Sequence, residues 1–211
     1  MKLKLFLIGI MAITQTTIAF AHGDGIEPVD AAEKALHKLE RYIVFNQLDE
    51  AYEHKLQTIT INKTTRQGKE VLDVTFIQSP SEENAETLKA VKLFYTLDGK
   101  FQSPYEEVEI PRATFSIQST HAIKHDTSPL KIAELTLHKI EDLAKVEEGY
   151  EVFAHEIARI DITHSEDNSL MVTVNLNPHE TPRERVEMTF DDDGNFIETR
   201  IVKPETSGGS Q

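Results

Sequence analysis

Two histidines, each flanked by glutamates at helical spacing, are the residues of this sequence best suited to chemistry. The two sets are Glu33, His37 and Glu40, and Glu134, His138 and Glu141. Residues three or four apart share one face of a helix, so each set would bring two carboxylates and an imidazole together. These groups bind zinc, copper and similar cations. The same spacing also occurs on ordinary solvent-facing helices, where a side-chain pair contributes about 0.3 kcal/mol, so both interpretations stay open.

The first 21 residues predict a cleaved secretory signal peptide (1–21). Lys2 and Lys4 give a positively charged start, and Leu5–Ile13 is an apolar run too short to span a bilayer. Ala19 and Ala21 are the small residues that a signal peptidase requires before its cleavage point. We therefore expect a periplasmic protein with no membrane segment after cleavage.

Cleavage after Ala21 would leave His22 at the amino terminus, at the start of a short arm (22–27). A terminal histidine offers its free amine and its ring nitrogen to one cation as a chelate, which suits copper. Asp24 adds a carboxylate, and His37 is one candidate for a third nitrogen. Terminal residues are also commonly unligated. The predicted metal ligands are His22, Glu33, His37, Glu134 and His138, with copper or zinc as the cation.

The composition excludes several classes of site and partner. The chain has no cysteine, which excludes disulfides, thiolate metal sites and cysteine nucleophiles. Its formal charge is −14, and removal of Lys2 and Lys4 with the leader makes it −16. Because such an acidic chain repels the phosphate backbone of nucleic acids, we expect no nucleic-acid partner. A basic protein or a metal ion is the expected partner.

A duplication runs through the chain after the leader. Residues 32–61 align without gaps with residues 133–162 at a constant offset of 101. With small deletions, the match continues into the residues that follow each of these two segments. Each copy has apolar residues at helical spacing, then alternating apolar and polar residues typical of half-buried strands. Asp98-Gly99 and Asp193-Gly194 suit tight hairpin turns.

The duplication predicts an α+β fold of two tandem repeats. Each repeat would be a helix and a short second helix packed on a three- to four-stranded antiparallel sheet. The expected boundaries are module 1 at 28–102, a connector at 103–128, module 2 at 129–204 and a disordered tail at 205–211. A module of about seventy residues is marginally stable alone, so we expect the two to share an interface.

Each half resembles the PepSY-like modules found in small exported proteins. The features that carry the resemblance are a leader ending in Ala21-His22-Gly23, an amphipathic helix, and the step from Leu48-Asp49 to the aromatic Tyr52 before the strands. The second copy keeps an aromatic residue, Phe153, but has Gly149-Tyr150 in place of Leu48-Asp49. Relatives usually carry tryptophan at the aromatic position and a single module. The resemblance implies an antiparallel sheet crossed by a helix, and roles such as peptidase inhibition or partner binding.

Two functions are compatible with these observations. The first is a non-catalytic binding or inhibitory protein, not an enzyme, that acts through its sheet face or the groove between modules. It accords with a sequence that has neither the metalloprotease motif HExxH nor the nucleophile motif GxSxG. The alternative is a metal-handling accessory protein that uses His22 and the helix-borne glutamate–histidine sets.

Overall fold

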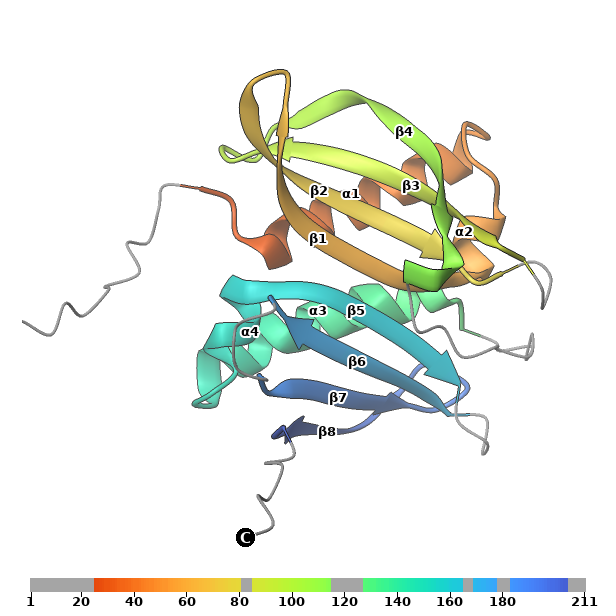
Figure 1. The fold of residues 1–211 in the computed structure, drawn as a ribbon. Coiled ribbons are helices and arrows are strands. Elements are labelled where there is room, and N and C mark those ends of the chain that lie inside the picture. The colour runs from red at the N-terminus through yellow and green to blue at the C-terminus, as the bar shows by residue number, and fades with distance from the viewer. Residues whose placement is uncertain (1–24, 81–84, 115–126, 165–168, 178–182, 205–211) are drawn as a thin grey trace, which may run out of the picture.

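The chain folds as two consecutive sets of helices and strands (Figure 1). The computed structural model describes residues 25–80, 85–114, 127–164, 169–177 and 183–204. The first set contains α1 (Pro28–Val44), α2 (Ala51–His54), β1 (Leu56–Arg66), β2 (Lys69–Gln78), β3 (Thr87–Thr96), β4 (Phe101–Pro111) and a 3-10 turn, η1 (Arg112–Thr114). The second contains α3 (Pro129–Val146), α4 (Glu151–Glu156), β5 (Ile157–His164), β6 (Leu170–Leu176), β7 (Arg185–Phe190) and β8 (Phe196–Val202).

Local sequence explains where several of these elements begin and turn. Pro28 and Pro129 lie in the first turn of α1 and α3, where a helix does not need the missing N–H group. The Ser128 hydroxyl caps α3 by accepting a hydrogen bond from the backbone N–H of Lys131. Gln67 and Gly68 have φ angles of 53° and 74°, the geometry of a two-residue hairpin turn between β1 and β2.

All eight strands form one antiparallel sheet in the order β4-β3-β2-β1-β5-β6-β7-β8. The expected fold of two tandem repeats, each a helix on its own sheet, is therefore wrong. The finding that overturns it is the pairing of β1 with β5, which turns the first strand of each set into a central strand. An isolated four-stranded unit would leave one side of its first strand with unpaired N–H and C=O groups, and this pairing satisfies them.

The pairing between β1 and β5 has a local two-fold symmetry. Thr58 lies opposite Asp161, Ile59 opposite Ile160, and Thr60 opposite Arg159. Ile59 and Ile160 are equivalent under the offset of 101 residues, so the symmetry axis passes between them. We call this pairing the seam.

One hydrophobic core lies between the helices and the sheet and spans both sets of elements. Ile59 and Ile160 are fully buried in it, together with Leu36 from α1 and Leu137 from α3. The apolar stripes of the two helices thus pack on the same face of a shared sheet (Figure 1). Burial of this continuous core, in addition to strand pairing, joins the two halves.

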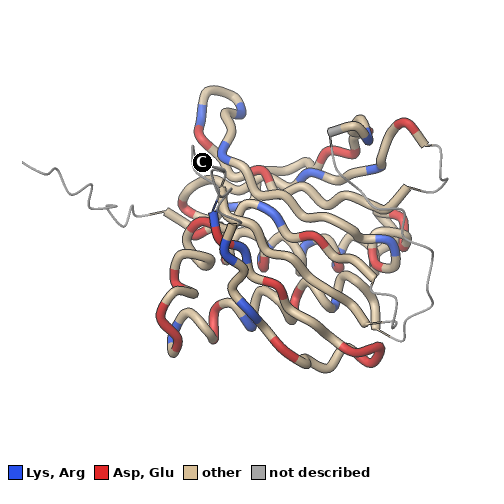
Figure 2. The backbone as a smooth tube through the Cα atoms, turned by 60° about the horizontal axis from the view of Figure 1, so that its bottom comes forward, with Lys and Arg blue, Asp and Glu red and all other residues tan. Residues whose placement is uncertain are grey.

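The opposite face of the sheet is polar at the seam. The Thr58 hydroxyl donates a hydrogen bond to the Asp161 carboxylate at 2.8 Å, and Arg159 Nε donates to the same group at 2.8 Å. Asn175 on the next strand donates to Asp161 at 3.3 Å. Along the backbone as a whole, acidic and basic residues are interspersed (Figure 2).

The expected boundary between module 1 and the connector lies within a strand, and other expected segments lie outside the described residues. The signal peptide (1–21), His22 and the tail (205–211) lie outside the described residues. The expected end of module 1 at residue 102 falls inside β4, so the first part of the connector is an edge strand of the sheet.

Replacing Ile160 by Ala tests the shared core. The lost side chain is fully buried at the seam, so the free energy of unfolding should fall by about 2–4 kcal/mol. Because one core spans both halves, urea unfolding followed by circular dichroism should show a single transition that shifts as a whole. Ile59→Ala, at the equivalent position, should act in the same way. Two separate transitions, of which only one moves, would contradict a shared core.

Candidate functional site

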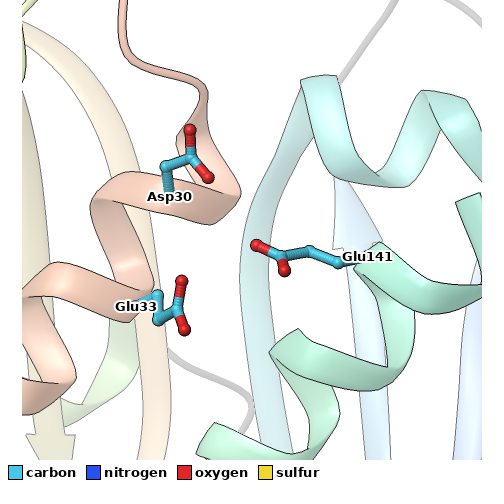
Figure 3. Close-up of side chains that lie close together, drawn as sticks. All are labelled: Asp30, Glu33 and Glu141. Carbon is cyan, nitrogen blue, oxygen red and sulfur yellow. The ribbon is translucent and has the colours of Figure 1, made fainter.

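Three carboxylates from two helices lie close together in the helix layer (Figure 3). Asp30 and Glu33 project from α1, and Glu141 projects from α3 toward them. One oxygen from each carboxylate lies within 4.8 Å of the other two, and all three residues are half-buried. We call Asp30, Glu33 and Glu141 the anionic cluster. It exists because the seam sets α1 and α3 side by side on one face of the sheet.

His138 joins the anionic cluster from α3. Its Nε2 atom lies 2.7 Å from Glu33 Oε1, a hydrogen-bonding distance across the two helices. His138 and Glu141 are three residues apart, so the imidazole and the carboxylate lie on the same side of α3. The imidazole of His138 therefore lies beside the anionic cluster and contacts one of its members, Glu33.

Repulsion inside the anionic cluster affects the protonation of Glu141. Burial, and then the negative charges of Glu33 and Asp30, raise the pKa of the Glu141 carboxyl above its ordinary value. Lys145 and His138 act in the opposite direction. The excess of negative charge is therefore only partly compensated by side chains, and a bound cation would compensate the rest.

The equivalent position in the other half of the molecule is neutralised by a lysine. Under the offset of 101 residues, Asp30 corresponds to Lys131 and Glu33 to Glu134. The Lys131 ammonium forms an ion pair with Glu134, and this hydrogen bond is the main cause that lowers the pKa of the Glu134 carboxyl. The second copy of the repeat thus has a positively charged side chain, Lys131, at the position where the first copy has a carboxylate, Asp30.

The predicted metal ligands are only partly brought together. Glu33 and His138 meet, although they come from different copies of the repeat. His37 pairs instead with Glu40 on its own helix, with Nδ1 3.5 Å from Oε2, and Glu134 pairs with Lys131. His22 lies outside the described residues.

Asp30 and Glu141 are the cluster members that do not appear among the predicted ligands. Asp30 is the one that a local pattern indicates. It lies one turn before Glu33, so the spacing of three residues is a local signal for it. The approach of Glu141 to Glu33 has no such signal, because it depends on how the two helices dock.

A groove of about 550 Å³ lies between α1, α2 and the start of α3. Its lining includes the apolar residues Ile43, Val44 and Leu130, the acidic residues Glu40 and Glu53, and the basic residue Lys131, which is paired with Glu134. Val44 is 74% exposed and the adjacent Phe45 65%, so two consecutive apolar side chains lie at the surface here. The groove combines an apolar surface with negative charge at the boundary between the two halves.

Comparison with protein-family models, with curated proteins and with solved structures finds no match for this chain. The PepSY-like resemblance therefore stays a prediction. Within the described ranges, no helix is both long and apolar enough to cross a membrane. Function is accordingly inferred from the geometry and charge of the anionic cluster and the groove.

Replacing Glu141 by Gln should stabilise the metal-free protein at neutral pH. A carboxyl whose pKa is raised by folding destabilises the native state when it ionises, so stability falls as the pH rises through the raised pKa. Gln removes this charge, and we expect a gain of about 0.5 kcal/mol at neutral pH. The gain should disappear below the ordinary glutamate pKa of 4.5, as measured by urea midpoints against pH.

Glu134→Gln is the matched control, and its effect should have the opposite sign. The pKa of Glu134 is lowered, so its ionised form stabilises the native state at neutral pH, and this contribution is lost as the pH falls through the lowered pKa. A loss of stability in Glu141→Gln at neutral pH would contradict repulsion within the cluster.

Proposed function

We propose that this chain is an exported, non-catalytic binding protein of the periplasm, and that one of its ligands is a divalent cation held by the anionic cluster. The observation that supports the proposal is the difference between the two halves. Where the second copy supplies the Lys131 ammonium to balance Glu134, the first copy has Asp30, which belongs to a group of three carboxylates that side chains compensate only in part. A metal ion would play the part at the cluster that the lysine plays at the equivalent position.

The donor set favours a cation that accepts oxygen together with nitrogen. Three carboxylates and one imidazole suit Zn²⁺ or Mn²⁺, whereas an amine and an imidazole at His22 would suit Cu²⁺. Entry of the cation would break the hydrogen bond between Glu33 and His138 and free both side chains as ligands. Because the pKa of Glu141 is raised, cation binding would displace a proton from this carboxyl at pH values near or below that pKa.

A second function, the binding or inhibition of a protein partner, is favoured by the groove. Its apolar residues would accept an apolar side chain, and Glu40 and Glu53 would attract a basic one. The exposed Phe45 beside Val44 extends the apolar surface. We propose a partner segment that contains both apolar and basic residues as the occupant of this groove.

Calorimetric titration of the protein processed after Ala21 tests the cation site. We expect Zn²⁺ or Mn²⁺ to bind with a dissociation constant of about 1 µM or below. Glu141→Gln should weaken binding at least about tenfold, because it removes one charged ligand. Glu40→Gln, at the equivalent position in the other half, is the matched control and should bind as the unmodified protein does.

Two outcomes of the titration would count against the cation site. One is binding weaker than about 1 mM for every cation tried. The other is equal weakening by Glu141→Gln and Glu40→Gln. If only His22→Ala abolishes copper binding, copper binds at the amino terminus. The titrations with Zn²⁺ and Mn²⁺ then decide whether the anionic cluster binds a cation.

Fluorescence anisotropy with labelled peptides tests the groove. A peptide that alternates leucine and lysine should bind, and one that alternates leucine and glutamate should not, because Glu40 and Glu53 repel it. Val44→Asp should weaken binding at least about tenfold, since it places a charge on the apolar surface. Val146→Asp changes an equally exposed valine at the end of α3, away from the groove, and should have no effect. Equal effects of the two substitutions would exclude the groove as the binding site.

A further inference from the structure

β8 forms one end of the sheet, and within the described residues no strand pairs with its outer edge (Figure 1). Apolar side chains are exposed along it, with Ile197 at 56% and Phe196 at 38%. The outer N–H and C=O groups of such an edge are a template for pairing with a further strand.

The other end of the sheet is protected against this kind of pairing. β4 carries Glu106, Glu107 and Glu109, together with Pro104 and Pro111. Charged side chains and prolines are the usual means by which an edge strand avoids another strand. β8 also carries charges, but Glu198 and Arg200 are of opposite sign and the strand has no proline, whereas the charges of β4 are all acidic. A second copy can therefore pair with β8 without like charges meeting.

The sequence of β8 is complementary to itself when two copies run antiparallel. With Thr199 opposite its own copy, Glu198 faces Arg200 on both sides of the axis. The register of β8 shifts at Ile197, so regular pairing runs from Glu198 to Arg200, and opposite charges meet at both of its ends. Cross-strand pairs of these kinds stabilise antiparallel sheets.

Charges beside the strand favour the same alignment. Lys203, which is 81% exposed, would lie near the acidic turn Asp191–Asp193 of the second copy. Arg200 contacts Glu187 of its own chain at 2.7 Å but stays 66% exposed. A guanidinium has five N–H donors, so Arg200 can also reach Glu198 of the second copy.

We propose that two copies of this chain associate through β8, by antiparallel pairing around a two-fold axis at Thr199, so that the sheet continues from one copy into the other. This contact between two chains would resemble the seam, where β1 and β5 pair symmetrically within one chain. A strand pair of this length buries less surface than a standard stable interface, so the dimer forms at high concentration, with a dissociation constant on the order of 100 µM.

Sedimentation equilibrium of the processed protein from about 10 µM to 1 mM tests the dimer, and the mean mass should approach twice that of one chain. Glu198→Arg sets arginine against arginine, and Arg200→Glu sets glutamate against glutamate, so each variant alone should stay monomeric. An equimolar mixture of the two should form a heterodimer, because each arginine then faces a glutamate. This recovery also shows that both variants fold. Glu107→Arg on β4 is the control and should leave the dimer unchanged.

Disulfide cross-linking tests the alignment of the strands. The chain has no cysteine, so Thr199→Cys introduces a single thiol directly at the proposed axis. It should form a disulfide-linked dimer under mild oxidation, since residues opposite each other in antiparallel strands lie within disulfide reach. Val202→Cys places the two thiols about 20 Å apart and should cross-link far more slowly. A protein that stays monomeric up to about 1 mM, or equal cross-linking rates for the two cysteine variants, would overturn the proposal.

Discussion

The antiparallel pairing of Ile59 with Ile160 is the constraint on which the rest of this molecule depends. Only three residues of each strand are paired across the seam. Nevertheless, their register decides whether the apolar faces of the two halves coincide, because with Ile59 in the core a shift of one residue would turn Ile160 to the polar face and bring Asp161 toward the core. Since both halves must present their apolar faces to the same side, α1 and α3 lie in one layer and share one core.

The two-fold symmetry at the seam also determines which polar side chains meet. It places each copy of the glutamate–histidine pattern across from the other, so that Glu33 contacts His138 instead of His37. The reverse combination is weaker. The pKa of Glu134 is lowered mainly by Lys131, and His37 contributes only a small part in the same direction. The difference between the two sides therefore arises from one position of the repeat, which is Asp30 in the first copy and Lys131 in the second.

The parts of this structure that depend on local pattern could be predicted from the sequence, whereas the docking of the two halves could not. The spacing of Leu36 and Leu137 predicts the buried helix faces, and Asp98-Gly99 predicts a turn where Gly99 has a positive φ of 78°. An internal repeat shows that two segments are equivalent, but it does not say whether their first strands face solvent or each other. That choice joined two expected sheets into one. It also put Glu141 beside Glu33, which no spacing along a single helix indicates.

Covalent linkage of the two halves explains both the short seam and the asymmetry of the anionic cluster. Within one chain the halves meet at a high effective concentration, so three residue pairs and a shared core are enough to hold them, whereas an edge such as β8 has no linker to assist it. Linkage also permits equivalent positions to differ. In a symmetric dimer of identical chains, an aspartate at position 30 would occur on both sides of the axis, and so would a lysine. Only a duplicated chain can place Asp30 on one side and Lys131 on the other, and with them an unbalanced group of carboxylates opposite a neutralised one.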